Sequence, residues 1–399
     1  MRHADATVHC ECVILPDRTP LTLTKAEARR IWLAAQRLDG LAPFGEGAEA
    51  VSRAVDHLGY VQIDTINVIE RCHHHILWTR IPGYRRQHLH QALSVDKTIF
   101  EYWTHALSYV PAKDIQFFLP AMKRHRQSVE TRFSSVSQDD LRRVLTLIRS
   151  GGALTIRDFD DEVLVEKEHA WASRKPSKRA LQRAFYRGEL TVSARSGMVK
   201  TYELMDRHFG WDRRPAAASE PQVLGYLLGR ALRSQGVVSL DSICHLDAPR
   251  KAAIRRLIEA GVRRKTLLPV AIEGAGKLEH WVRPEMSDIS PSSEPEMAHL
   301  LSPFDPLIIQ RKRLQLFFDY GHRFEAYVPK EKRILGYFAL PVLDGNEIIA
   351  AIDLKADRET RRLLVQQWTW VGRGAAGSHK ARVEEALHRF SDFQFDGLS

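Results

Sequence analysis

The chain has 399 residues, and 59 Lys and Arg against 49 Asp and Glu give it a formal charge of +10. Its hydrophobic content of 44% is ordinary for a globular protein and excludes a fibrous or wholly disordered chain. At about 150 residues per domain, this length predicts two to three domains. The isoelectric point near 9.5 indicates a polyanionic partner.

The cysteines and the apolar runs indicate a cellular compartment. Four cysteines, at positions 10, 12, 72 and 244, are too few and too scattered for a disulfide framework, which predicts a reducing cytoplasm. Residues 1–20 form a polar leader without the apolar core of a signal peptide, and no apolar run reaches the length of a membrane span. We therefore expect a soluble, cytoplasmic protein with no membrane partner.

Residues 21–136 predict a first module. Thr24 and Glu27 have the spacing of a capping box ahead of a helix at 26–38. A glycine-punctuated loop at 40–47 leads to a second helix at 48–58, which runs into a strand near residue 61. This order of helix, turn, helix and strand suits a winged-helix unit, whose small helical core is closed by a short strand and a hairpin.

That strand carries the candidate catalytic pair. Val61, Ile63 and Thr65 alternate with Gln62 and Asp64, so Ile63 should point into the core while Gln62 and Asp64 share the other face. A carboxylate beside an amide can hold one water: the carboxylate takes its proton or faces a developing cation, and the amide orients it. In the competing interpretation, Asp64 caps a helix that begins near residue 66 and Gln62 is an ordinary exposed strand residue.

Histidines are dense after this strand. Cys72 is followed by three consecutive histidines, and His88 and His90 come soon after. No Cys-x-x-Cys or His-x-x-x-His pair on a regular element accompanies them, so we predict no metal site. Instead, one or two of the histidines should hydrogen-bond to backbone or to DNA phosphate.

A second cluster of aromatic and charged side chains lies at residues 101–105. We expect Glu101, Tyr102, Trp103 and His105 to lie in a single helical turn or sharp bend, where Tyr102 and Trp103 wall a pocket. Core packing is an equally good explanation of Trp103.

Residues 137–212 repeat the winged-helix pattern with more positive charge. An amphipathic helix at 139–149, stopped by two glycines, precedes a short element at 154–159, a helix at 176–187 and a hairpin at 188–202. The helix at 176–187 has the features of a recognition helix. Its basic residues recur at intervals of three or four, which predicts a stripe on DNA phosphates, with a solvated basic face as the alternative. They are Lys175, Lys178, Arg179, Arg183 and Arg187.

An Ala- and Pro-rich linker at 213–221 opens a third copy, residues 213–286. It predicts a helix at 222–234, a turn element at 238–243, a basic helix at 249–260 ended by Gly261, and a hairpin at 267–282. The basic residues expected on DNA here are Arg250, Lys251, Arg255 and Lys277.

After a Ser- and Pro-rich loop at 287–295, residues 296–399 predict a β-rich domain. Strands are expected at 325–328, 333–342, 348–354 and 365–371, with a turn at Asp344-Gly345 and a closing helix at 378–390. Asp305 and Arg311 lie where this domain begins. They either support the catalytic pair from behind or form an ion pair in a connector.

Several separated blocks of the chain resemble the YcaQ-like family of bacterial DNA glycosylases that repair interstrand crosslinks. The blocks are residues 60–66 with Glu70, Arg71, His73 and His74, then 100–106, 301–307 and 324–329, within roughly residues 20–370. The catalytic motif of that family is Gln, an apolar residue, then Asp or Gln. In this sequence it stands as Gln62-Ile63-Asp64.

The resemblance implies an α+β fold in which about three tandem winged helix-turn-helix modules are scaffolded by a C-terminal β-rich domain. It implies a monofunctional DNA glycosylase that acts on double-stranded DNA carrying N7-alkylated or crosslinked purines through Gln62 and Asp64. We expect no cofactor, a monomer, and a bacterial protein associated with the nucleoid. The candidate pocket residues are His73, His74, Glu101, Tyr102, His105 and Asp305.

A second class of function is a non-enzymatic winged-helix DNA-binding protein, such as a transcriptional regulator. It predicts the same charge, helices and wings, but it has no use for Gln62 and Asp64.

Overall fold

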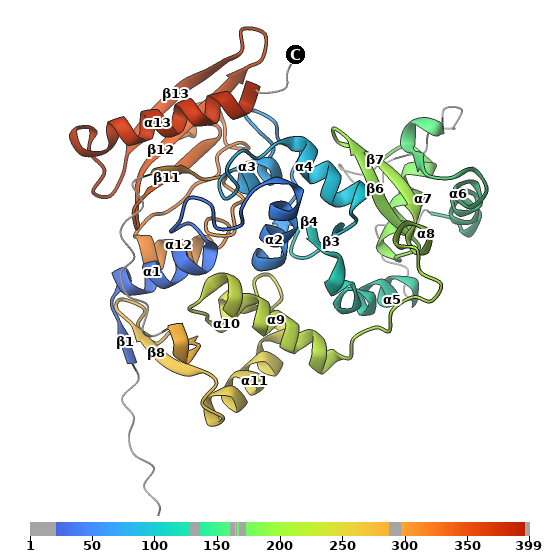
Figure 1. The fold of residues 1–399 in the computed structure, drawn as a ribbon, viewed down its shortest axis with the longest axis horizontal. Helices are drawn as coiled ribbons and strands as arrows, with labels where there is room; N and C mark the ends of the chain where they lie inside the picture. The colour runs from blue at the N-terminus through green and yellow to red at the C-terminus, as the bar shows by residue number, and fades with distance from the viewer. Residues whose placement is uncertain are drawn as a thin grey trace, which may run out of the picture.

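The computed structural model describes residues 21–127, 136–159, 164, 166, 173–286 and 297–395. The leader at 1–20 and the loop at 287–295 lie outside the described residues. Four small sheets organise the described part of the chain, three of them with helices on either side in sequence and the fourth near the C-terminus (Figure 1). No helix among the described residues is long and apolar enough to cross a membrane.

The first unit is built around a three-stranded sheet in which β4 lies between β2 and β3. Its elements are α2 (Gly47–Leu58), β2 (Val61–Gln62), α3 (Cys72–Trp78), α4 (Arg86–His90), a π-helical turn (Gln91–Val95), β3 (Ile99–Trp103) and β4 (Leu107–Pro111). Gly59 ends α2 with φ +79°, a left-handed conformation that favours glycine. This confirms the predicted helix before the candidate catalytic strand.

The hairpin of β3 and β4 corrects the expectation of a helical turn at residues 101–105. Phe100 and Tyr102 point to one side of β3 and Glu101 to the other, yet all three are at most 2% exposed. Burial on both faces removes the apolar–polar alternation by which a strand is usually recognised. The charge that makes Glu101 burial possible comes from Arg195, which is distant in the sequence.

The second unit confirms the predicted helices and hairpin. A 3₁₀ turn (Ala112–Phe117) and α5 (Leu119–Gln127) connect it to the first unit. Its elements are α6 (Gln138–Gly151), β5 (Leu154–Thr155), a 3₁₀ turn (Ile156–Asp158), α7 (Pro176–Tyr186), β6 (Leu190–Ser196), β7 (Val199–Leu204) and α8 (Met205–Phe209). Pro176 occupies the first turn of α7, where its missing N–H costs nothing.

The third unit contains α9 (Glu220–Gln235), α10 (Leu240–Ile243), α11 (Lys251–Arg263), β8 (Leu268–Ile272) and β9 (His280–Val282). Contrary to the prediction, α11 continues past Gly261. A Cβ built on Gly261 would lie 2.9 Å from Leu267 Cδ1, so this glycine lets the segment after α11 pack closely against the helix and does not end it.

The N-terminal segment packs mainly with the third unit and the C-terminal part, and not with the first unit alone as the predicted order suggests. The capping box of Thr24 and Glu27 is present and starts α1 (Lys25–Gln36). However, β1 (Leu21–Leu23) pairs in parallel with β8, and Trp32 of α1 packs on Phe317 and Phe318. The short strand β1 therefore joins the first described residues to the third unit.

The C-terminal part is an antiparallel sheet in the order β10, β11, β12, β13, covered by a long helix. Its elements are β10 (His299–Leu300), α12 (Arg311–Phe318), β11 (Ala339–Asp344), β12 (Glu347–Asp357), β13 (Arg362–Trp370) and α13 (Ala376–Phe395). Buried residues of α13 and of β12 share one core with α2 and α3. This places the first unit directly against the C-terminal sheet.

One predicted strand of this part, at 325–328, is wrong, and the one predicted at 333–342 begins only at Ala339. Residues 325–328 form a turn, because the Glu325 carboxylate accepts the backbone N–H groups of Ile334 and Leu335. Residues 333–338 are irregular, because Gly336 has φ +114° and the Asp353 carboxylate takes the N–H groups that follow it. In both places a buried carboxylate satisfies the backbone donors that a strand partner would otherwise take.

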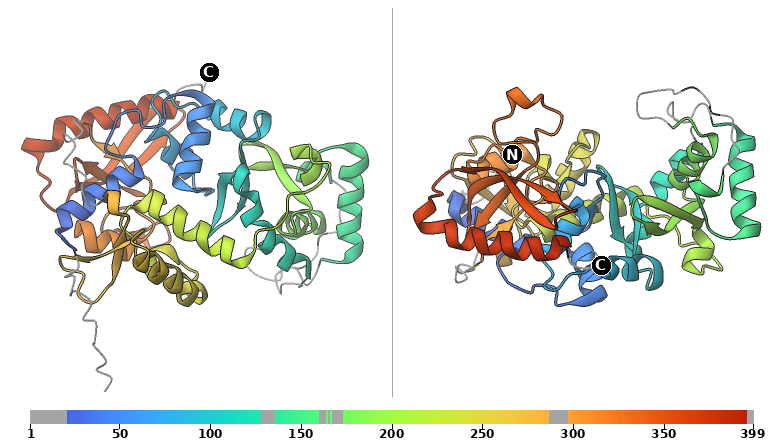
Figure 2. Two further views of the ribbon diagram at one scale, coloured as in Figure 1. Left: turned by 60° about the horizontal axis from the view of Figure 1, so that its bottom comes forward. Right: turned by 90° about the horizontal axis from the view of Figure 1, so that it is seen from above.

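The three units share an order of elements. Each has a helix, a short strand or bridge, one or more helices, and a hairpin. In each, the short strand pairs antiparallel with the second strand of the hairpin: β2 with β4, β5 with β7, and Val238 with Trp281. Figure 2 shows the second unit at one end of the molecule and the C-terminal sheet with α13 at the other.

Candidate active site

Gln62, the last residue of β2, is 7% exposed. Its Oε1 lies 3.1 Å from Nε2 of His105, in the turn between β3 and β4. Burial, with the charges of His245 and Arg230, lowers the pKa of His105 to about 4, so the ring is neutral at pH 7 and donates its one proton to Oε1. No described residue accepts a hydrogen bond from the Gln62 amide nitrogen, which leaves it as a donor.

Asp64 follows where the chain leaves the sheet. The Ile63 N–H still donates to Leu107 O at 2.8 Å, so the backbone stays extended to that point. Asp64 is partly exposed, and its Oδ1 accepts the Ile66 N–H at 2.8 Å. Because no helix begins at Ile66, this contact fixes a local turn and not a helix end. The other carboxylate oxygen accepts no hydrogen bond from the described residues.

Cys72, the first residue of α3, holds the backbone of this segment by a hydrogen bond. Its thiol donates to Gln62 O at 3.1 Å. Burial, together with the negative charge of Asp64, raises the pKa of Cys72 well above its usual range. A thiol that stays protonated is a poor nucleophile, so Cys72 holds the strand.

The β12–β13 hairpin holds the residues that follow Asp64. One guanidinium nitrogen of Arg358 donates to Asn67 O and Asn67 Oδ1, both at 3.0 Å, and to Ile69 O at 2.6 Å. Ala356 N also donates to Val68 O at 3.0 Å. The candidate catalytic segment is thus fixed between β4 on one side and a hairpin almost 300 residues away in sequence on the other.

Of the three consecutive histidines on α3, His73 and His74 have ring centres 4.3 Å apart, whereas His75 points towards Leu300. His75 Nε2 bonds to Leu300 O at 2.9 Å, which confirms that one of them binds backbone. His74 Nδ1 lies 2.7 Å from Tyr84 Oη, and His73 packs edge-on against Tyr109. Burial lowers the pKa of His74 to about 3 and that of His75 to about 4. In the described parts of the chain, no three His, Cys, Asp or Glu residues are grouped to hold a metal ion.

Glu101 is neutralised by the second unit. Arg195 of β6 forms two hydrogen bonds with its carboxylate, one of them 2.7 Å long, and Lys200 of β7 lies 3.5 Å away. Burial alone would raise the pKa of Glu101, but the charges of Lys200 and Arg195 outweigh burial and lower it. This buried cluster connects β3 to the second hairpin, and nothing in the local sequence of either strand indicated it.

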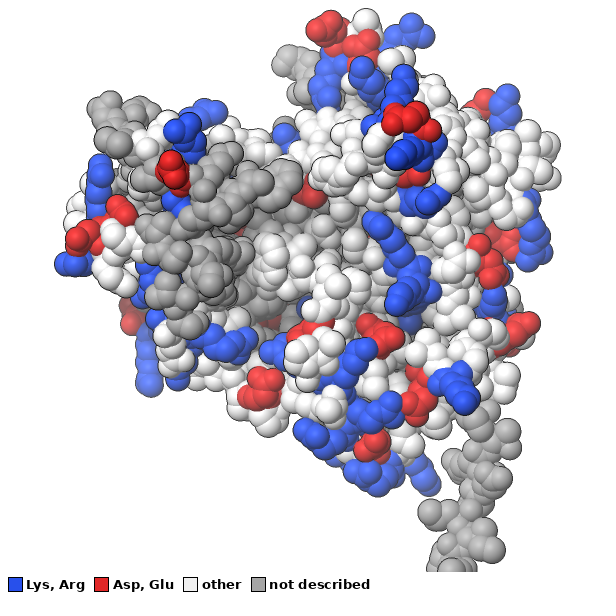
Figure 3. Space-filling model, turned by 180° about the vertical axis from the view of Figure 1, so that it is seen from behind, with Lys and Arg blue, Asp and Glu red and all other residues white. Residues whose placement is uncertain are grey.

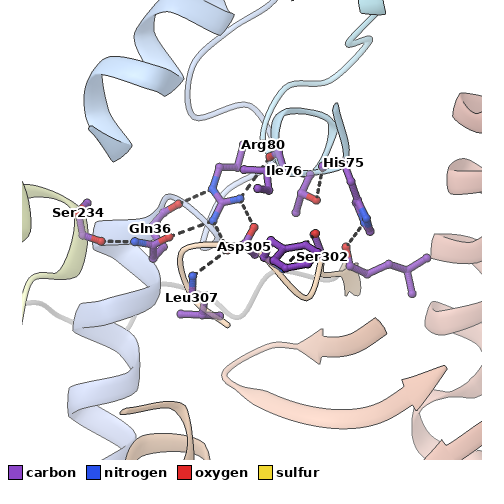
Figure 4. A network of polar contacts seen from close by, with 11 residues as sticks. Gln36, His75, Ile76, Arg80, Ser234, Ser302, Asp305 and Leu307 are labelled. Atoms are coloured by element: carbon purple, nitrogen blue, oxygen red, sulfur yellow. Dashed lines mark hydrogen bonds and ion pairs between the residues drawn. The ribbon is translucent and has the colours of Figure 1, made fainter. Parts of the chain in front are cut away.

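Asp305 pairs with Arg80 and not with Arg311. Arg80 donates to both carboxylate oxygens, at 2.7 and 3.0 Å, and neither side chain is exposed. Arg80 also donates to Gln36 O and Gln36 Oε1, and Gln36 Nε2 bonds to Ser234 O (Figure 4). The network joins α1, the residues after α3, α9 and the segment before α12. Asp305 therefore serves to hold these elements together.

Four of the six predicted pocket residues line two cavities, whereas Glu101 and Asp305 line neither of these. Tyr102 and His105 line a cavity of about 440 Å³ between the first and third units, on the Gln62 side of the sheet. His73 and His74 line one of about 300 Å³ on the opposite side, with Arg195. Sequence analysis missed Arg230 and His245, which face His105 from the third unit, because only the fold brings these units together.

The predicted DNA-contacting residues lie in different settings. Arg179 and Arg183 are buried, and Arg183 donates to Val136 O at 2.6 Å, so the α7 stripe is not continuous on the surface. Several others form ion pairs within the protein: Arg187 with Glu189, Arg250 with Asp247, Lys251 with Asp241, and Arg255 with Glu279.

Lys175 is partly buried and donates to Phe159 O, whereas Lys178 and Lys277 are exposed and have no carboxylate partner among the described residues. Figure 3 shows basic side chains interspersed with acidic ones on one face of the molecule. This face therefore carries no continuous basic band that would identify it as the DNA-binding surface.

Comparison with known proteins identifies the family. A sequence model of the AlkZ-like DNA glycosylases matches residues 55–393, which include Gln62, Asp64 and Asp305. The structure resembles the DNA glycosylase AlkZ of Streptomyces sahachiroi with a TM-score of 0.62 and 17% identity, over 94% of this chain and 97% of that one. At this identity the likeness shows the fold alone, whereas the match over most of the chain shows the family. The chain belongs to the AlkZ-like family and is a DNA glycosylase.

Proposed function

We propose that this DNA glycosylase hydrolyses the N-glycosidic bond of N7-alkylated purines in duplex DNA and unhooks interstrand crosslinks, with Gln62 and Asp64 as its catalytic residues. The observation that carries the proposal is the state of the two side chains. His105 donates to Gln62 Oε1, which leaves the amide N–H groups of Gln62 free to donate. One carboxylate oxygen of Asp64 accepts the Ile66 N–H, and the other is free of any described donor. An oriented donor and a free carboxylate are what a bound water needs.

The mechanism follows from the leaving group. Alkylation at N7 makes the purine cationic, so its bond to the sugar breaks without a general acid, unlike ordinary glycosides that use two carboxylates. Asp64 stabilises the oxocarbenium-like sugar and accepts a proton from water. Gln62 aims that water at the anomeric carbon. The sequence has no lysine nucleophile motif, so the product is an abasic site in an uncut strand.

We assign the three units to tandem winged helices. The first module, predicted at 21–136, begins at α2, because β1 and α1 pack with the third unit and the C-terminal part. The other two modules are 137–212 and 213–286, and residues 296–399 are their scaffold. The shared order of elements and the pairing of each short strand with the hairpin support this assignment. Such a scaffold presents an open surface to the duplex, which suits a base tethered to both strands. The family match leaves no place for the alternative of a non-enzymatic regulator.

A single-turnover gel assay tests the catalytic pair. One duplex carries N7-methylguanine and another a nitrogen-mustard crosslink, and alkali reveals abasic sites. Asp64→Asn should keep the fold and duplex affinity but slow excision by about 10²-fold or more, because one such electrostatic contact is worth about 3 kcal/mol. Gln62→Ala should be milder. Asp56→Asn, on the exposed side of α2, is the matched control.

Unchanged excision by folded Asp64→Asn protein would remove the assignment of the catalytic carboxylate. Activity of the wild-type protein on the methylated duplex alone would remove crosslinks from the substrate range.

A further inference from the structure

The cavity of about 300 Å³ lies on the face of the first sheet opposite Gln62 and takes no part in the proposed reaction. Its walls come from α3, α4, the π-helical turn after α4, strand β4 and the tip of the β6–β7 hairpin of the second unit (Figure 1). Gln87, His90 and Gly197 at its rim are exposed. The cavity is therefore open to a small group from solvent.

Two polar side chains that line this cavity lack partners. His73 is 3% exposed, and its buried Nδ1 has no hydrogen-bond partner among the described residues. The buried Nε of Arg71 likewise has none, and no carboxylate of the described residues pairs with this guanidinium. A buried polar group without a hydrogen bond costs free energy, so such groups are few in folded proteins. Two of them in one cavity indicate that a ligand completes their hydrogen bonds.

The charge around the cavity favours an anion. Three arginines line it, and no described Asp or Glu does. These arginines are Arg71, Arg86 and Arg195. Glu70 pairs with Arg86, whereas Glu101 is shared between Arg195 and Lys200. The carboxylates near the cavity thus leave positive charge uncompensated, and Arg71 carries part of it.

His73 is in the state that suits an acceptor ligand. Burial, together with the charges of His74, Arg195 and Arg71, lowers the pKa of His73 well below its usual range. The ring is therefore neutral at pH 7 and carries one N–H to donate. The oxygens of a phosphate can accept this N–H and the N–H groups of a guanidinium at the same time, and phosphate matches the planar fork of arginine.

We propose that this cavity binds a phosphate group, with the guanidinium of Arg71 and the ring N–H of His73 as its donors. Arg86 and Arg195 are held in place by their carboxylates and border the site with fixed positive charge. The phosphate comes either from the backbone of a DNA strand that passes over the rim or from a free phosphate ion, since both present the same oxygens. The site is separate from Gln62 and Asp64, so it does not rest on the proposed reaction.

Two variants remove the donors and keep the surrounding packing. Arg71→Gln removes a charge that has no described carboxylate partner, so it leaves no carboxylate unpaired. His73→Phe keeps a ring against Tyr109 and removes the unpartnered nitrogen, so this variant should unfold at the same temperature as the wild type or a higher one. Arg85→Gln, at an exposed arginine beside α4 that lies outside the cavity, is the matched control.

Titration calorimetry with inorganic phosphate, at constant ionic strength, measures the site directly. We expect Arg71→Gln and His73→Phe each to lose about tenfold or more in phosphate affinity, and Arg85→Gln to bind as the wild type does. If His73 only stabilises the fold, His73→Phe will unfold at a lower temperature with unchanged phosphate affinity, and the proposal fails.

Undamaged duplex identifies the source of the phosphate. If DNA supplies it, inorganic phosphate should compete with the duplex more strongly than chloride at the same ionic strength. Arg71→Gln should then lower the slope of log K against log salt by about 0.9. If a free ion occupies the site, the variants should change phosphate affinity but neither duplex affinity nor this slope.

Equal phosphate affinity of all four proteins, together with equal salt slopes, would overturn the proposal. Because these measurements involve no excision, a failure of the catalytic assignment of Gln62 and Asp64 would not affect them.

Discussion

Arg80 and Asp305 are joined by two hydrogen bonds, of 2.7 and 3.0 Å, and neither side chain is exposed to solvent. All five N–H groups of a guanidinium need partners when it is buried. The others are carbonyl oxygens of Gln36 and Ile76 and the amide oxygen of Gln36. The pair therefore ties the end of α3, close to the catalytic segment, to the C-terminal part.

Asp305→Asn should lower the free energy of unfolding by about 3–5 kcal/mol, because it leaves a buried guanidinium without its counter-charge. Urea unfolding at pH 7 measures the loss. The double variant Arg80→Met/Asp305→Leu should recover part of it, since apolar residues replace both charges. A loss below about 1 kcal/mol in Asp305→Asn would contradict this account of the pair.

We expect His105 to position Gln62 through their hydrogen bond and to take no direct part in the reaction. His105→Phe keeps a ring but removes the N–H that holds Gln62 Oε1. We expect about a tenfold lower single-turnover rate with unchanged duplex Kd. His105→Gln retains a donor and should lose less. If both variants lose the same activity, the hydrogen bond is not what matters.

Lys178 and Lys277 are the exposed members of the predicted DNA-binding set. Their joint replacement by Ala should weaken binding to damaged and undamaged duplex alike. It should also lower the slope of log K against log salt by about 0.9 for each phosphate that the protein no longer neutralises. Lys380→Ala on α13 is the control. An unchanged slope in the double variant would assign both lysines to a solvated surface.

Buried His75 should make the protein sensitive to acid. Burial lowers the pKa of His75 to about 4, whereas an unfolded histidine titrates near 6.5. Between these values the unfolded chain binds the extra proton, so the free energy of unfolding falls as the pH falls from 6.5 towards 4. Below pH 4 this contribution is fully lost.

The variant His75→Gln isolates that effect. Its unfolding free energy should depend less steeply on pH near pH 5, by about 1.3 kcal/mol per pH unit at most. Urea unfolding at pH 7 and pH 5 measures the slope. Parallel slopes in the two proteins would show that His75 is protonated in the folded state.

Excision should need no added metal. A cationic leaving group asks only for an oriented water and a negative charge, whereas a metal-activated water needs about three protein ligands in defined geometry. Full activity in excess EDTA is expected on the methylated duplex. If EDTA abolished excision and zinc restored it, the active site would have to be assigned to the histidines at 73–75 and not to Gln62 and Asp64.

The sequence by itself determined the helices with clear caps, the hairpins of the second and third units, and the motif Gln62-Ile63-Asp64. Those features depend on neighbours a few residues apart: Thr24 with Glu27, or Gly59 at the end of α2. Only the tertiary structure decided that β3 is a strand and that Arg183 is buried. It also decided that Arg358, Arg230 and His245 surround the candidate site. Each of these features depends on charges or hydrogen bonds supplied from distant parts of the chain. A local sequence pattern cannot predict them, because the partner residues come together only when the chain folds.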